Sequence, residues 1–149
     1  MRLKEFGGYS GGLDKSSLTG EHSIYQEFED NQIMFHVSTL LPHSVKDQQQ
    51  LERKRHIGND RVCIVFQDEY TPFSPQMIKS NVLHVFVLVQ PTRVENGARA
   101  YQLSVMSRED VPDIEPFVRR PYVFKKDQHF KRFLLTKLIN AEYESLKAR

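Results

Sequence analysis

A polar and basic segment between Gln48 and Asp60 holds the side chains best suited to surface chemistry. It contains Arg53-Lys54-Arg55-His56 and, after one apolar residue, Gly58-Asn59-Asp60. Consecutive basic residues are found in nuclear-localisation and nucleic-acid-binding patches, although three alone are a short match. Asparagine and aspartate beside glycine are also the usual composition of a simple turn. The residues alone therefore leave both a recognition role and a turn open.

The elements around this segment decide how it is presented. Ser44 or Asp47 would cap a helix running to about Ile57, and Gly58 is a natural C-terminal stop. This helix has too few apolar residues for a core-facing stripe, so we expect it to be peripheral or to meet a partner. The apolar run Val62–Phe66 predicts a central buried strand that anchors the end of the segment.

The rest of the chain predicts an α/β fold class, with a mixed β-sheet flanked by helices in a single domain. Strands are expected near Glu21–Phe28, Gln32–Thr39, Val82–Val89 and, after an Asn96-Gly97 turn, Tyr101–Met106. The prolines of Val111–Pro121 exclude regular pairing there. Asp127 would cap a final helix whose apolar stripe packs on the sheet, comprising Phe130, Phe133, Leu134, Leu138 and Ala141.

The composition describes an ordinary folded domain. The chain has 149 residues, of which 27% are charged, and its length fits one domain with a real core. No apolar run is long enough to span a bilayer, and the start lacks the apolar stretch of a secretory signal. One cysteine, Cys63, and no Asn-x-Ser/Thr sequon indicate a reducing, cytoplasmic setting.

Several kinds of self-contained chemistry are unsupported. The six histidines are scattered and form no metal-ligand spacing: His22, His36, His43, His56, His84 and His129. We expect His36 and His84, in predicted strands, to be hydrogen-bonded structural residues. The glycines at 7–12 lack the ending of a phosphate-binding loop, no nucleophile elbow is present, and Cys63 lies mid-strand. We therefore expect no cofactor, no bound metal and no hydrolase site within this chain alone.

Charge is distributed unevenly along the chain. Residues 1–30 carry three positive and six negative side chains, whereas Arg119–Arg132 carries six positive and one negative. The basic stretch would steer an acidic partner or a phosphate-bearing ligand, or it is simply a solvated face.

Four strings, in order, resemble the catalytic domain of the Rap GTPase-activating protein family, which also includes tuberin and the Ral GTPase activators. The first is Arg53–Asp60, which reads RKRHIGND and precedes a strand. The others are Gly11–Asp14 (GGLD), Met34–Pro42 (MFHVSTLLP) and Phe133–Glu142 (FLLTKLINAE). The likeness covers nearly the whole chain, residues 1–149, and the form of the Met34–Pro42 string resembles the Rap-directed branch.

The resemblance implies a mechanism in which the chain completes the active site of another protein. Small GTPases hydrolyse GTP slowly because the attacking water is poorly oriented and transition-state charge is poorly stabilised. Most GTPase activators supply an arginine to a site whose own glutamine positions the water. Rap lacks that glutamine, and proteins of this family insert an asparagine carboxamide, the asparagine thumb, which matches Asn59 here.

The resemblance also implies roles for six further positions. They are His56, Arg55 and Lys54 beside the thumb, and Asp60, His36 and Val82 as supporting or GTPase-contacting residues. The expected partner is a GTP-loaded Rap-family GTPase, in preference to Ral or Rheb, met in the cytoplasm or at a membrane to which the GTPase recruits the domain. No nucleic-acid partner is expected.

Two features depart from the family pattern. Val82 stands where an aromatic residue that touches the GTPase is expected, and Asp113–Phe117 replaces a loop that more often resembles Phe-Gly-Pro-Pro. The flanking helical regions that usually accompany the domain, including one for dimerisation, are also not in the chain, so we expect a fragment. A domain that binds a GTPase without catalysis, and a nucleic-acid-binding domain using the basic stretches, remain the alternatives.

Overall fold

The computed structural model describes residues 1–68, 71–118 and 120–148. These residues form two compact units, Met1–Asn59 and Asp60–Arg149, each with its own internal packing. Arg119, at the start of the predicted basic stretch, lies outside the described residues.

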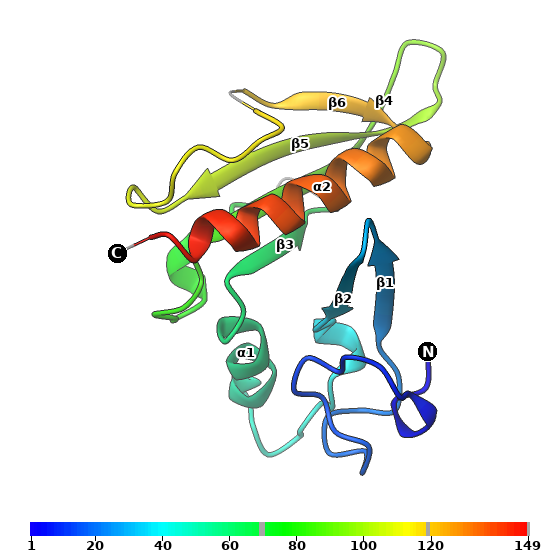
Figure 1. Ribbon diagram of the computed structural model, residues 1–149, viewed down its shortest axis with the longest axis vertical. Helices are drawn as coiled ribbons and strands as arrows, with labels where there is room; N and C mark the ends of the chain where they lie inside the picture. The colour runs from blue at the N-terminus through cyan, green and yellow to red at the C-terminus, as the bar shows by residue number, and fades with distance from the viewer. Residues whose placement is uncertain (69–70, 119, 149) are drawn as a thin grey trace. The chain divides into compact units, whose positions relative to one another are not determined.

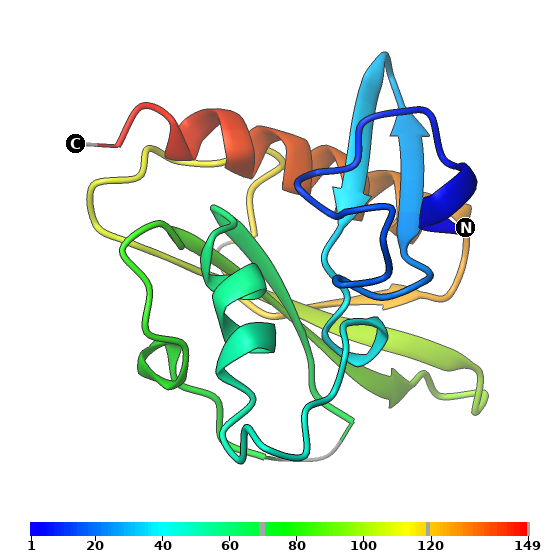
Figure 2. The same cartoon turned by 90° about the horizontal axis from the view of Figure 1, so that it is seen from below.

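The first unit is built on a β-hairpin and a short helix (Figures 1 and 2). It contains the 3-10 helices η1 (Leu3–Glu5) and η2 (Ser38–Leu40), strands β1 (Ile24–Phe28) and β2 (Asn31–Phe35), and helix α1 (Leu51–Gly58). Glu29 and Asp30, which join the antiparallel strands, both have positive φ. That conformation matches the strand twist of a tight hairpin. Both strands are shorter than the sequence predicts.

A small apolar cluster fixes the first unit. Leu3, Leu13 and Leu41 are buried together, and Met34 and Ile57 pack against them. These residues come from η1, the following loop, β2, the end of η2 and α1. The cluster therefore ties α1 to the hairpin and the N-terminal segment within this unit.

Helix α1 begins later than predicted, at Leu51 and not near Ser44 or Asp47. The backbone of Gln50 is left-handed, with φ of 51°, and residues 44–50 form turns closed by the Gln50 side chain on the Ser44 carbonyl. Asp47 still accepts a hydrogen bond from the Glu52 amide, so its capping function is exerted from outside the helix. Gly58 is the last residue of the helix, and Asn59 is its C-terminal cap.

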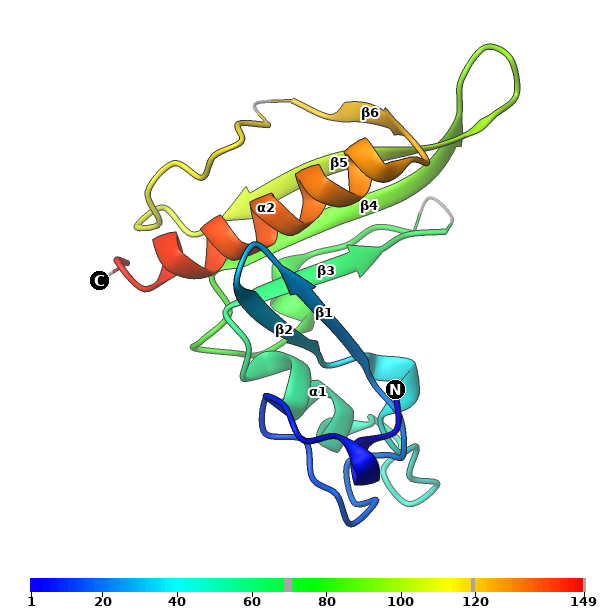
Figure 3. The same ribbon diagram turned by 45° about the vertical axis from the view of Figure 1, so that its right-hand side comes forward.

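The second unit is a mixed four-stranded sheet with a long helix on one face (Figures 1 and 3). Its elements are β3 (Val62–Phe66), η3 (Pro75–Met77), β4 (Val85–Arg93), β5 (Arg99–Ser107), β6 (Tyr122–Lys125) and α2 (Gln128–Ser145). The strand order is β3-β4-β5-β6, parallel between β3 and β4 and antiparallel elsewhere. The predicted α/β class with a mixed sheet is confirmed.

The core of this unit lies between the sheet and α2. Val85, Val87 and Leu103 are almost fully buried, and the ring of Phe124 on β6 packs against Phe133 on α2. Three predictions for this unit are confirmed. The Asp127 carboxylate caps α2 by accepting a hydrogen bond from the Phe130 amide at 3.0 Å. The β4–β5 hairpin forms around Asn96-Gly97, and the described part of Val111–Pro121 is irregular.

Two expectations for this sheet were wrong or incomplete. Val62–Phe66 is not a central strand, because β3 pairs only with β4 in the described sheet and Phe66 is 58% exposed. An apolar run predicts a strand that packs in part against the core, but it does not show whether both edges of that strand are hydrogen-bonded. The short strand β6 was not predicted.

Candidate functional site

Helix α1 is anchored on one side by an arginine and an isoleucine. Ile57 packs on the apolar cluster, while Arg53, one turn earlier on the same face, donates to the Leu41 carbonyl through Nε (3.1 Å) and Nη2 (2.9 Å) and to the Pro42 carbonyl (3.2 Å). Charged donors form strong hydrogen bonds, and the helix has few other tertiary contacts. Arg53 therefore holds α1 where apolar packing alone would be weak.

Asn59 occupies the end of α1, on a different face from these anchors. Its backbone is helical (φ −88°, ψ −6°), and its amide donates to the carbonyls of Arg55 and Ile57. The side chain is exposed, and within residues 1–59, all of which are described, its carboxamide has no hydrogen-bond partner. The backbone of Asn59 is fixed while its functional group stays available.

Arg55 and His56 lie one helical turn before Asn59, so the three side chains share one side of α1. Arg55 is exposed and pairs with Glu52, which orients the guanidinium but contributes little stability at such an exposed position. Lys54 is exposed and projects from another face of the helix. Arg55 and His56 thus lie beside Asn59, whereas Lys54 places its charge elsewhere on the surface of the helix.

His36 joins this group from the residue after β2. Its ring lies edge-on to the ring of His56, with centroids 6.0 Å apart. The Nε2 atom lies 2.7 Å from the Gly11 carbonyl, to which it must donate because a carbonyl only accepts. Gly11 has φ of 59°, and a Cβ there would approach Met34 to 3.2 Å, which explains glycine at this position. His36 is hydrogen-bonded as predicted, and it supports His56.

The loop after Gly11 is held by its own aspartate. Thr19 donates to Asp14 Oδ1 from both its amide and its hydroxyl, and Ser16 donates to Oδ2. Burial raises the pKa of Asp14, but these hydrogen bonds outweigh it and the net pKa is lowered. The carboxylate is a structural acceptor.

Asp60 and Val82 belong to the second unit. Asp60 is half-buried near Cys63. Val82 is half-buried on the turn before β4, where the Ser80 hydroxyl accepts from the amides of Val82 and Leu83, both at 3.0 Å. His84, next to this turn, is buried and hydrogen-bonded as predicted.

The comparisons with known proteins decide what kind of domain this is. The family model described as Rap/ran-GAP matches residues 1–149. The chain belongs to the Rap/ran-GAP family. It is 48% identical over 99% of its length to the human GTPase-activating Rap/Ran-GAP domain-like protein 3, and 45% identical over 99% to the mouse signal-induced proliferation-associated 1-like protein 1.

A solved structure of the TSC2 GAP domain is similar to this Rap/ran-GAP domain, with 31% identity, a TM-score of 0.79, and coverage of 98% of this chain and 76% of that one. The chain spans only 15% of the human relative and 8% of the mouse relative. It therefore corresponds to the domain that these longer proteins share.

In the described ranges, no three His, Cys, Asp or Glu side chains gather to hold a metal ion. Among the same residues, neither helix has the length and apolarity needed to cross a membrane.

Sequence reasoning missed three structural roles. It did not find the backbone contacts of Arg53, the side-chain network around His84, or the buried Lys137 on α2. Lys137 carried a usable signal, because it falls on the same helical stripe as the apolar residues that face the sheet. The contacts of Arg53 and His84 bring together residues distant in the chain, which sequence spacing does not reveal.

Replacing Arg53 with glutamine should detach α1 from the η2 segment. We expect amide hydrogen exchange in α1 to become at least tenfold faster, since hydrogen bonds to charged groups contribute roughly 1.5–3 kcal/mol each and about 1.4 kcal/mol is a tenfold change. Arg55→Gln, at an exposed position, gives the comparison for loss of a charge on the same helix. Faster amide hydrogen exchange in residues 51–58 of the Arg53 variant alone would support the anchoring role, and unchanged exchange would contradict it.

Cys63 should be almost unreactive in the folded domain. Burial, with the negative charge of Asp60, raises the pKa of its thiol from 9.0 to about 11. We expect iodoacetamide at neutral pH to react about a hundredfold more slowly than with the unfolded chain, from the smaller thiolate fraction alone. Because the unfolded thiol ionises first, folding stability should fall as the pH rises from about 9 toward 11. Equal alkylation rates for folded and unfolded chains would contradict this.

Proposed function

We propose that this domain accelerates GTP hydrolysis by a Rap-like small GTPase, with Asn59 as an asparagine thumb inserted into the partner's active site. The observation that carries the proposal is the exposed Asn59 carboxamide, without a partner in its own unit, at the end of a helix anchored by Arg53 and Ile57. Membership of the Rap/ran-GAP family across all 149 residues gives this arrangement its context.

The chemistry of a carboxamide suits this task. A neutral amide carries a donor and an acceptor in one plane, so it can orient the attacking water without taking its proton. It also brings no negative charge toward the phosphates, whereas an aspartate would be repelled by them. In a reaction that depends on positioning and charge stabilisation, an amide carried on a fixed backbone is an effective contribution.

The neighbouring residues would assist Asn59. Arg55 and Lys54 place exposed positive charges near the thumb and would attract the acidic, phosphate-bearing partner. His56, steadied by the ring of His36, would line the approach to Asn59. Asp60 would support the connection that follows the thumb.

A Rap-family substrate is the first choice because the Met34–Pro42 string resembles the Rap-directed branch. The related human GTPase-activating Rap/Ran-GAP domain-like protein 3 and a Dictyostelium discoideum GTPase-activating protein belong, by their names, to the same general class. We further propose that the domain acts in the cytoplasm and reaches membranes through its GTPase.

A second candidate function is GTPase binding without catalysis. Val82, in place of the expected aromatic residue, and Asp113–Phe117, in place of the expected loop, favour it because both depart from the pattern of the GTPase-activating family. Hydrolysis of GTP by an excess of GTPase over the domain separates the two functions. A binding module would leave the rate of GTP hydrolysis at that of the GTPase alone. Many GTPases converted per domain would support catalysis, and binding with the intrinsic rate unchanged would support the module.

A further inference from the structure

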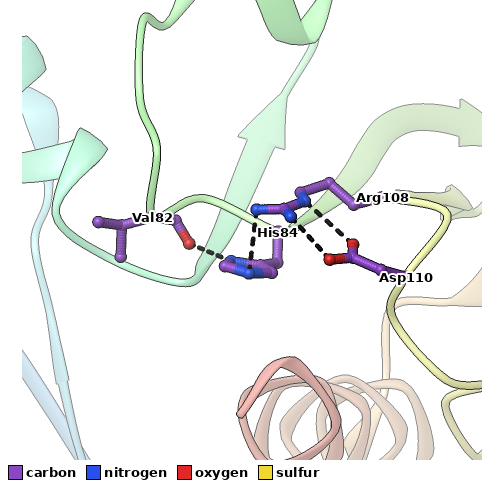
Figure 4. A network of polar contacts seen from close by, with 4 residues as sticks. All are labelled: Val82, His84, Arg108 and Asp110. Atoms are coloured by element: carbon purple, nitrogen blue, oxygen red, sulfur yellow. Dashed lines mark hydrogen bonds and ion pairs between the residues drawn. The ribbon is translucent and has the colours of Figure 1, made fainter. Parts of the chain in front are cut away.

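The side chain of His84 sits at the centre of a polar network before β4 (Figure 4). The residue is 7% exposed, and its Nδ1 contacts the Val82 carbonyl while Nε2 lies 3.2 Å from Nη1 of Arg108. Arg108 in turn forms a two-pronged ion pair with Asp110, through Nε at 3.0 Å and Nη2 at 2.7 Å. Every nitrogen of the imidazole ring is therefore used.

The partners of His84 determine its tautomer. The guanidinium of Arg108 only donates, so Nε2 must accept and carry no proton. The proton is then on Nδ1, which donates to the Val82 carbonyl. Asp110 holds the guanidinium in the orientation that selects this tautomer, so the contact to Val82 depends on all three side chains.

The same residue also fixes the start of the sheet. The amides of His84 and Val85 both donate to the Arg61 carbonyl, at 2.9 and 3.1 Å, and the Arg108 amide donates to the His84 carbonyl at 2.9 Å. Arg61 follows Asn59 by two residues in the chain. The backbone of His84 therefore anchors the segment after the thumb, while its side chain anchors the turn that carries Val82.

We propose that His84 is a positioning residue that sets the Val82 turn in the conformation that docks the GTPase. The turn is held from both sides, by the Ser80 hydroxyl on the Val82 amide and by His84 on the Val82 carbonyl. These two hydrogen bonds fix the backbone of Val82 and so set the direction in which its half-buried side chain leaves the turn. This inference rests on the proposed function, and on the family resemblance that places Val82 among the GTPase-contacting residues.

Two amide substitutions separate the two contacts of the ring. In His84→Asn the side-chain amide lies near the position of Nδ1 and can still donate to Val82, whereas in His84→Gln it lies nearer the position of Nε2 and can meet only Arg108. We expect His84→Gln and His84→Ala to raise the KM for GTP-loaded Rap about tenfold with kcat within about twofold, the effect of losing one docking contact. His84→Asn should restore most of the wild-type KM.

A double-mutant cycle tests whether His84 acts through Val82. We expect Val82→Ala to raise KM in the wild-type background but to have little further effect in His84→Ala, and the exposed His43→Ala to change neither constant. Additive effects, a better rescue by Gln than by Asn, or a fall in kcat at unchanged KM would each overturn the inference while the proposed function stands. A wild-type domain that neither binds nor activates a GTPase would overturn both.

Discussion

Replacing Asn59 with alanine should reduce GTPase activation by two or more orders of magnitude and leave the GTPase bound. The size follows from the analogous task of an arginine finger, which supplies about 10³–10⁵ in rate. The alanine variant should fold normally, because the backbone amide of Asn59 still caps α1 and the lost carboxamide has no partner in its unit. Single-turnover hydrolysis by GTP-loaded Rap measures the rate, and titration against the GTPase measures binding.

Two other substitutions at Asn59 sharpen this prediction. Asn59→Asp is nearly isosteric but brings a negative charge to the phosphates, so we expect it to lose activity and also to weaken binding. Asn59→Gln keeps the amide on a longer chain and should retain part of the activity. Gln49→Ala, which removes an exposed carboxamide from the loop before α1, is the matched control and should behave as wild type. Full activity of Asn59→Ala would contradict the thumb mechanism.

Replacing Lys137 with methionine should cause the largest loss of stability. Its Nζ donates to the carbonyls of Ile114 (2.6 Å) and Pro116 (2.9 Å), and the residue is only 3% exposed. Burial lowers the pKa of this lysine, and the charge of Asp113 opposes the shift. Methionine fills a similar volume but leaves both carbonyls without this donor, so we expect the free energy of unfolding to fall by about 2–4 kcal/mol.

Urea unfolding of the purified domain gives this free energy directly. Asn140→Ala removes a single neutral hydrogen bond, from Nδ2 to the Glu115 carbonyl at 2.9 Å, and should cost only about 1 kcal/mol. Lys126→Met, at an exposed position, is the matched control for loss of a lysine. A loss in Lys137→Met no larger than in this control would show that the lysine does not hold the 114–116 segment.

Local patterns in the sequence predict the second unit better than the first. Asp127 and the helical stripe that follows predict α2, and Asn96-Gly97 predicts the β4–β5 hairpin, because each signal acts between residues close in the chain. The start of α1 was mispredicted because Asp47 contacts the first turn from outside the helix, after Gln50 has taken a left-handed conformation. A cap signal identifies the acceptor but not the number of residues between it and the helix.

In the candidate site too, contacts between residues close in the chain are predictable and contacts between distant residues are not. Helical spacing alone places Arg55 and His56 beside Asn59. The approach of His36 to His56, and the network that joins His84 to Arg108, depend on how strands bring distant residues together. The sequence predicts that both histidines are structural, but their partners are visible only in the fold.

The central claim is tested most directly by measuring GTP hydrolysis by GTP-loaded Rap with the wild-type domain present at about one part in a hundred. Ral and Rheb would be measured in parallel. We predict that nearly all of the Rap-bound GTP is hydrolysed at least a hundredfold faster than without the domain, about the lower end of what an inserted side chain supplies. Hydrolysis of all three GTPases at their intrinsic rates, with binding retained, would contradict catalysis and leave a docking module.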